Sequence, residues 1–132
     1  MKGKIKMYKT KRIEKWIGYD FETDELKKDR IFRVFARMFQ AEIESQLAEK
    51  KYEIVIYIRG NFYISGFISN SDRTRYVYFA VPDVRYTRNW HKQVLVREAK
   101  NRHDYIGGIN NYTSLENFGE AVNKLMNGRS YL

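Results

Sequence analysis

The fold is decided by residues 52–81, YEIVIYIRGNFYISGFISNSDRTRYVYFAV. From Tyr52 onward, isoleucine alternates with other residues, as in a strand that buries one face. Gly60-Asn61 predicts a two-residue turn into a second strand over residues 62–69. A polar turn then leads to a third strand over residues 74–81. Because these links are short, we expect antiparallel pairing.

A long helix is expected before these strands, over residues 22–50. Thr23 is a suitable N-cap, and acidic residues follow it in the first turn, where the helix dipole favours negative charge. Apolar residues then recur three or four apart, which predicts one buried face: Ile31, Phe32, Phe35, Phe39, Ile43 and Leu47.

After the third strand, residues 93–99 predict a fourth strand, and the glycines and asparagines of residues 107–111 predict a loop. Thr113 and Glu116 have the spacing of a capping box. We therefore expect a C-terminal helix over residues 113–127, with Gly128 as its stop.

These elements predict an α+β fold of one domain, residues 1–132: a long N-terminal helix, a four-stranded and mainly antiparallel sheet, and a C-terminal helix. Residues 1–21 form a basic N-terminal arm, and residues 51–100 form the sheet. Both helices are expected on one face of the sheet.

The composition narrows the class of protein. The chain of 132 residues has no cysteine, which excludes disulfides and thiolate zinc sites and is typical of a reducing cytosol. No stretch approaches the roughly 18 apolar residues of a membrane span. We therefore expect a soluble, cytoplasmic protein with no membrane partner and no cofactor.

Positive charge is concentrated at the N-terminus. The formal net charge is +9, and residues 1–16 contain seven lysines and arginines against the single acid Glu14. Such a field suits a polyanion, which means nucleic acid or an acidic or DNA-binding surface of a nucleoprotein.

Two sets of residues are candidates for these contacts. The first comprises cations of the arm and of one side of the first helix: Lys4, Lys6, Lys9, Lys11, Arg12, Arg30, Arg33 and Arg37. The second interleaves arginine with aromatic residues, as in sites that bind single-stranded nucleic acid or protein: Arg85, Tyr86, Arg88 and Trp90. The many tyrosines are also compatible with a homodimer.

One enzymatic alternative exists. VPDV at residues 81–84 and VLVREAK at residues 94–100 resemble the signature of the PD-(D/E)xK nuclease superfamily. The resemblance implies a magnesium ion held by Asp83 and Glu98, with Lys100 steadying the attacking water.

The segment VLVREAKNRHDYIGGINNYTSLENF, residues 94–118, resembles short, cysteine-free proteins rich in lysine, tyrosine and asparagine from Gram-positive phages and mobile elements. Among these are the type II-A anti-CRISPR proteins, which block the Cas9 nuclease. The resemblance implies a non-enzymatic inhibitor of a CRISPR effector.

Three functions therefore remain open: direct binding of nucleic acid, inhibition or adaptation of a nucleoprotein machine, and metal-dependent cleavage. We predict a non-enzymatic binder that acts on nucleic acid or on a nucleoprotein, which joins the first two. His103-Asp104 and Gly107-Gly108 are interpreted as loop residues rather than as a general base or a phosphate cradle.

Overall fold

A computed structural model of the chain describes residues 8–21 and 28–128. Its helices and strands are, in chain order, η1 (Lys11–Trp16), α1 (Lys28–Leu47), η4 (Ala48–Lys50), β1 (Glu53–Gly60), β2 (Tyr63–Ser69), β3 (Tyr76–Val81), α2 (Thr87–His91), β4 (Val94–Ala99), β5 (Asn111–Thr113), η5 (Leu115–Asn117) and α3 (Phe118–Met126).

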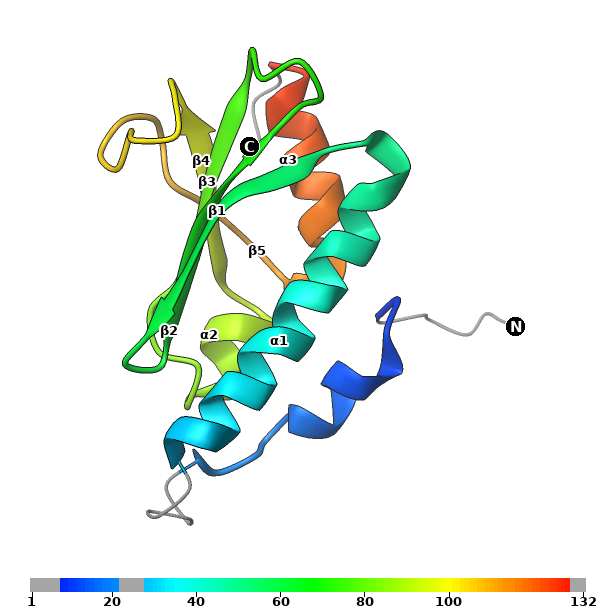
Figure 1. Cartoon of the computed structure of the whole chain (residues 1–132), viewed down its shortest axis with the longest axis vertical. Coiled ribbons are helices and arrows are strands. Elements are labelled where there is room, and N and C mark those ends of the chain that lie inside the picture. Colours follow the sequence, from blue (N-terminus) through cyan, green and yellow to red (C-terminus); the bar gives the residue numbers. More distant parts are fainter. Residues whose placement is uncertain (1–7, 22–27, 129–132) are drawn as a thin grey trace.

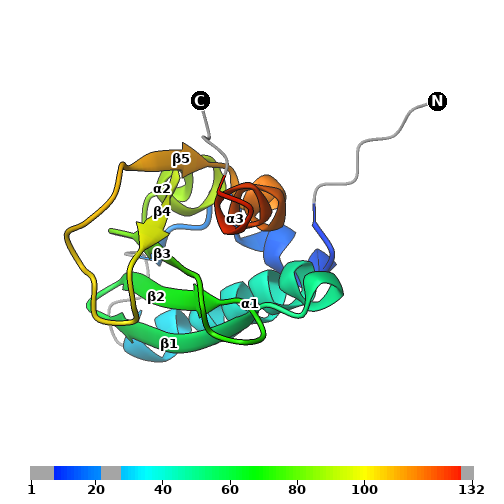
Figure 2. The same ribbon diagram turned by 90° about the horizontal axis from the view of Figure 1, so that it is seen from above.

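The strands form one sheet in the order β1-β2-β3-β4-β5, and every neighbouring pair is antiparallel. Helices α1 and α3 lie on one side of the sheet, and the loop between β4 and β5 lies on the other (Figures 1 and 2). The α+β prediction is confirmed, but the sheet has five strands rather than four. We missed β5 because three residues beside asparagines and glycines are too few to show alternation.

The turn between β1 and β2 lies one residue later than predicted. Its central residues are Asn61 and Phe62, with φ of 52° and 66°. A type I′ turn requires positive φ at both positions, a conformation that asparagine adopts readily and phenylalanine rarely. Phe62 is held there by packing, because its ring contacts Phe32 at 5.3 Å between centroids and the Arg85 guanidinium at 4.6 Å.

Helix α1 buries the predicted apolar face. Phe35, Phe39 and Ile43 are completely buried against the sheet, and Leu47 is buried near the end of the helix. The structure has α1 from Lys28 to Leu47, so the proposed N-cap Thr23 and the rest of residues 22–27 lie outside the described residues.

Part of the basic arm belongs to the core. Ile13 and Trp16 of η1 are buried, and so is Phe21 beyond it. The Trp16 ring stacks on Phe21 at 5.7 Å, and its indole N–H donates to the sulfur of Met38 on α1 at 2.9 Å. The arm therefore docks along α1 from residue 8 to residue 21, while residues 1–7 lie outside the described residues.

The C-terminal helical region differs from the prediction at its start. Thr113 lies in β5, and Ser114 precedes the short helix η5 without a side-chain capping bond, so the predicted capping box is wrong. The buried face of α3 is as expected, because Phe118 and Val122 are completely buried. Gly128, with φ of 73°, ends this region as predicted.

Within residues 8–21 and 28–128, no helix combines the length and the apolar character needed to cross a membrane.

Candidate nucleic-acid interface

A buried carboxylate attaches the N-terminal segment to α1. Glu42 is completely buried. It accepts hydrogen bonds from the backbone N–H of Lys9 at 3.1 Å and of Thr10 at 2.8 Å, and from the Thr10 hydroxyl at 2.7 Å. The Gln46 amide donates a further bond at 2.7 Å. A buried polar group is tolerated only with hydrogen-bond partners, and these bonds hold residues 9 and 10 against α1 immediately before η1 begins.

A second contact ties the same segment to α2. The Tyr8 hydroxyl is hydrogen-bonded to Nδ1 of His91, and both side chains are buried. Burial, followed by the charge of Lys92, lowers the pKa of His91, so the imidazole is neutral at pH 7 and its Nδ1 accepts the bond. Burial likewise raises the pKa of Tyr8, which keeps its proton and donates.

These two attachments bring Arg12 of η1 beside Arg37 of α1. The two arginines line a shared groove of about 280 Å³, whose other lining residues are Thr10, Val34, Met38 and Ala41. The groove thus has apolar side chains from α1 and a guanidinium group on each of two elements. An arrangement of this kind can pair with phosphate oxygens while apolar atoms contact a sugar or a base.

Further cations lie along the two elements that line this groove. Arg30, Arg33 and Arg37 are exposed and lie on the side of α1 opposite its buried face, as the helical period predicts. Arg12 and Lys15 are three apart in η1, so they lie on one side of a 3₁₀ helix. No ion pair neutralises these five residues within the part of the chain that the structure describes. We call them the cationic face: Arg12, Lys15, Arg30, Arg33 and Arg37.

Four predicted cations of the arm are not part of the cationic face. Lys4 and Lys6 lie outside the described residues, and so does the side chain of Lys11. Lys9 is described, and its ammonium group pairs with Glu49 at 3.3 Å.

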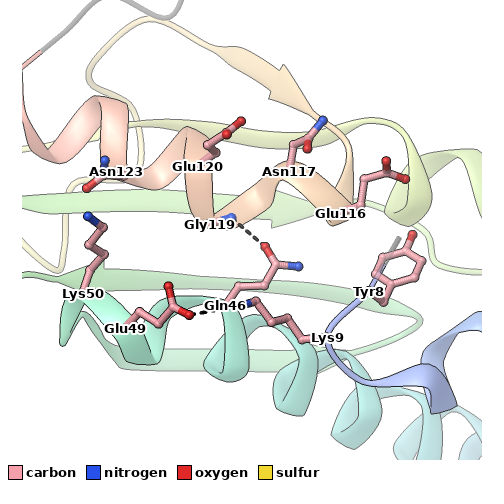
Figure 3. Close-up of a pocket in the computed structure, with 10 residues that line it drawn as sticks. All are labelled: Tyr8, Lys9, Gln46, Glu49, Lys50, Glu116, Asn117, Gly119, Glu120 and Asn123. Atoms are coloured by element: carbon pink, nitrogen blue, oxygen red, sulfur yellow. Dashed lines mark hydrogen bonds and ion pairs between the residues drawn. The ribbon is translucent and has the colours of Figure 1, made fainter. Parts of the chain in front are cut away.

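Lys9 and Glu49 belong to a different groove, between the end of α1 and the start of α3 (Figure 3). This groove of about 330 Å³ carries both signs of charge, since Glu116, Glu120 and Lys50 also line it. Its mixed charge makes it a poor site for a polyanion. Gln46 crosses it and accepts the backbone N–H of Gly119 at 2.7 Å.

The second predicted patch is not one surface. Trp90 is completely buried and packs edge-on against Phe35 at 5.1 Å, so its assignment to a binding surface is wrong. Arg85 is half-buried and pairs with Asp83 at 3.0 Å. Tyr86, which precedes α2, and Arg88, within α2, are exposed and remain available to a partner.

The predicted nuclease residues do not meet. Asp83 follows the end of β3, whereas Glu98 pairs with Val77 near the start of that strand. The length of β3 from Val77 to Val81 alone separates them by roughly 13 Å. Asp83 is also engaged by the Arg85 side chain and backbone N–H. Asp83 and Glu98 are therefore too far apart for one magnesium ion to bridge their carboxylates, and the site implied by the nuclease resemblance is not assembled in this fold.

The β4–β5 loop, which contains Gly107 and Gly108, is closed by an internal carboxylate. The Asp104 carboxylate accepts the backbone N–H of Lys100 at 2.9 Å and of Gly107 at 2.8 Å. These bonds lower the pKa of Asp104, so the carboxylate is charged at neutral pH.

Sequence reasoning found the arginines of α1 but missed their meeting with η1. The available signal was the apolar pair Ile13 and Trp16 within the basic arm, which marks a segment that packs. The sequence does not indicate that Val34, Ala41 and Met38 line a groove with Arg12, because that contact forms only in the tertiary structure. Neither protein-family models, nor curated proteins, nor solved structures gave a match to this chain.

Proposed function

We propose that this protein is a non-enzymatic binder of nucleic acid, free or within a nucleoprotein, and that the cationic face makes the principal contact. The observation that carries this proposal is the meeting of Arg12 and Arg37 at one groove from two separate elements. A run of basic residues can be a solvated tail. A folded segment that is fixed beside an arginine row presents its charges together.

The chemistry of the face favours phosphate. Four of its five cations are arginines, whose planar guanidinium groups form paired hydrogen bonds to phosphate oxygens. Arg30 and Arg37 are separated by about two turns of α1, or roughly 10 Å along its axis. A nucleic-acid backbone can therefore engage several of these side chains at once. The arm residues Lys4 and Lys6 precede the attached segment and are part of the same proposal.

The direct test is the salt dependence of binding to fluorescently labelled duplex DNA, single-stranded DNA and single-stranded RNA. If five to eight cations engage duplex phosphates, the logarithm of the association constant falls against the logarithm of salt concentration with a slope of about −4.5 to −7. A slope near zero for all three probes would rule out a phosphate contact.

Charge reversal locates the contact. The double variant Arg33→Glu, Arg37→Glu should reduce affinity for the tightest probe by about 100-fold and make the salt slope shallower by about 2. The double variant Lys100→Glu, Arg102→Glu is the matched control, because it changes the net charge equally at two exposed residues of the loop at the other side of the sheet. Equal losses in both variants would show a nonspecific effect of net charge instead of a defined face.

The resemblance to type II-A anti-CRISPR proteins names one nucleoprotein for a separate assay. Under this proposal the protein slows DNA cleavage by purified Cas9 with its guide RNA, and the Arg33→Glu, Arg37→Glu variant does not. Full cleavage at a large excess of the wild-type protein would remove this effector as the target and leave nucleic-acid binding to the salt titration.

A further inference from the structure

The face of the sheet that points away from α1 and α3 carries its own apolar cluster. Phe67 of β2 is completely buried, yet it is not part of the main core. Its ring contacts Tyr78 of β3 and Tyr105 of the β4–β5 loop, each at 5.0 Å between centroids. An antiparallel sheet often leaves such a face polar. We call this side the back face.

The β4–β5 loop is built onto one half of the back face. The guanidinium of Arg97 is buried beneath it and donates to the carbonyl oxygens of Asp104 at 3.3 Å and Gly107 at 2.5 Å. The same group lies 4.5 Å from the centre of the Tyr78 ring. The Asp104 carboxylate closes the turn. The loop is therefore fixed by two polar side chains, Arg97 and Asp104, which bond to its backbone.

The loop holds its isoleucines outward. Ile106 is 95% exposed and Ile109 is 78% exposed. The neighbouring Tyr112 on β5 is 58% exposed. Large apolar side chains exposed on an ordered loop mark an interaction surface, because such a loop loses little further conformational entropy when a partner binds.

The other half of the back face is partly exposed and has a small-residue centre, in which Ala80 is half-buried and Ser65 is buried. One cross-strand row runs through all five strands in register: Ile58, Ser65, Ala80, Leu95 and Tyr112. Its inner members are a serine and an alanine, and its outer members are large and apolar. We call it the open row. A protruding apolar loop thus sits next to a stretch of the same face with little side-chain bulk.

We propose that two copies of this chain pair back to back, with Ile106 and Ile109 of each copy on the open row of the other. A two-fold axis requires a surface that complements itself, so that a protrusion on one copy meets a recess on the other, and the reverse. The loop and the open row lie side by side on one face and meet this requirement.

The size and charge of the back face also favour a second copy. Five strands about 4.8 Å apart and on average about 20 Å long give a face of roughly 480 Å² before side-chain relief is counted, which is near the lower bound of about 500 Å² per partner for a specific interface. The Arg97 charge is buried and hydrogen-bonded, and the cationic face lies on the opposite side of the sheet. Neither therefore opposes the approach of two copies, and the exposed Arg102 of the loop is a charge on this side that salt can screen.

Other occupants fit less well. Isoleucine side chains have no π face for stacking on bases, so nucleic acid would leave Ile106 and Ile109 unused. Two isoleucines also bury fewer carbons than a single lipid chain, which by itself binds membranes only marginally.

Pairing would give the protein two outward cationic faces. Because α1 and η1 lie on the side of the sheet away from the back face, a back-to-back pair directs them in opposite directions (Figures 1 and 2). Such a pair can bridge two nucleic-acid segments. This consequence rests on the proposed function, whereas the pairing does not.

The pairing is tested by sedimentation equilibrium on nuclease-treated full-length protein, from about 1 µM to about 1 mM. The wild type should form a dimer. Ile106→Asp should raise the dimer dissociation constant by about tenfold or more, since it places a charge in an apolar contact. Ile17→Asp is the matched control, as Ile17 is 40% exposed at the end of η1 on the helical side. A wild type that stays monomeric, or an Ile106→Asp variant that pairs equally well, overturns the proposal.

The absence of cysteine allows a direct test of the geometry. Proteins carrying Ile106→Cys and Ala80→Cys are mixed and oxidised, and the expected product is a disulfide between the two different chains. Ile17→Cys mixed with Ala80→Cys should give none beyond the level of random collision. If Ile106→Cys shows no preference for Ala80→Cys, or if the protein binds anionic lipid vesicles through Ile106 as a monomer, the proposed contact is wrong. A dimer that fails to bind nucleic acid would contradict only the proposed function.

Discussion

Gly66 of β2 lies so close to the carbonyl oxygen of Ile56 on β1 that a β-carbon at this position would collide with it. The same β-carbon would come within 2.9 Å of the Phe79 ring. The contact lies beside the register shift between Ile54 and Ile56, where β1 bulges.

We therefore expect Gly66→Ala to lower the free energy of unfolding by about 2 kcal/mol or more, because the sheet cannot absorb an extra methyl group there. Gly60→Ala is the matched control. No heavy atom lies within 4 Å of its β-carbon, and its effect should stay within about 0.5 kcal/mol. Urea unfolding measures both, and similar values for the two variants would contradict the close approach.

Removal of the Glu42 carboxylate should loosen the N-terminal segment. Glu42→Ala leaves the backbone N–H groups of Lys9 and Thr10 without their acceptor, so the free energy of unfolding should fall by about 2 kcal/mol or more. Nucleic-acid affinity should fall too, because Arg12 loses its fixed position beside Arg37. Glu44→Ala on the exposed side of α1 is the control. If Glu42→Ala alters stability no more than Glu44→Ala, the carboxylate is not the attachment.

His91 should make the protein less stable in mild acid. Its folded pKa lies below the ordinary 6.5, with burial as the larger cause and Lys92 as the second. The unfolded chain therefore takes up a proton first, and stability is lost as pH falls from 6.5 toward the lowered pKa. Urea unfolding at pH 7.5 and pH 5 measures the loss.

His91→Gln should remove part of that pH dependence, since glutamine offers the Tyr8 hydroxyl an acceptor but takes up no proton. His103→Gln, at the exposed histidine of the β4–β5 loop, should preserve it. Identical pH profiles for the two variants would exclude His91 as the titrating group.

The Asp104 carboxylate should control order in the β4–β5 loop. Backbone N–H bonds, that of Lys100 first and that of Gly107 second, hold its pKa below the ordinary 3.8. Loop stability is then complete above 3.8 and is lost as pH falls through the lowered value. At neutral pH, Asp104→Asn should speed hydrogen exchange of the Gly107 amide by about tenfold. Asp72→Asn, in the β2–β3 turn, should leave that amide unchanged, and equal protection in all three proteins would contradict the role of Asp104.

The helices and strands could be predicted from the sequence, because each depends on the spacing of apolar residues within one segment. The apolar row that includes Phe35 and Phe39 specified the buried side of α1. Alternation placed Val77 and Phe79 together, and β3 proved central in the sheet, as two semi-apolar faces suggest. The turn was displaced by one residue because the packing of Phe62, a nonlocal contact, outweighs its poor preference for positive φ.

The candidate sites were less predictable because they depend on which segments meet. Trp90 sits among basic and polar residues in the sequence, yet α2 turns it onto Phe35 in the core. Asp83 and Glu98 had a familiar spacing, but strand pairing put them at different ends of β3. Arg12 gained its neighbour Arg37 only through the packing of η1 on α1.

The bond between Tyr8 and His91 spans 83 positions of the chain. A ribosome that adds about 5–20 residues per second needs roughly 4–17 s to make the second partner after the first. Glu42 is made before His91, so for the last roughly 2–10 s of that interval the N-terminal segment can engage the growing α1 before its final attachment exists. Translation speed thus sets how long the N-terminal segment of the nascent protein is attached through Glu42 alone, before the bond between Tyr8 and His91 can form.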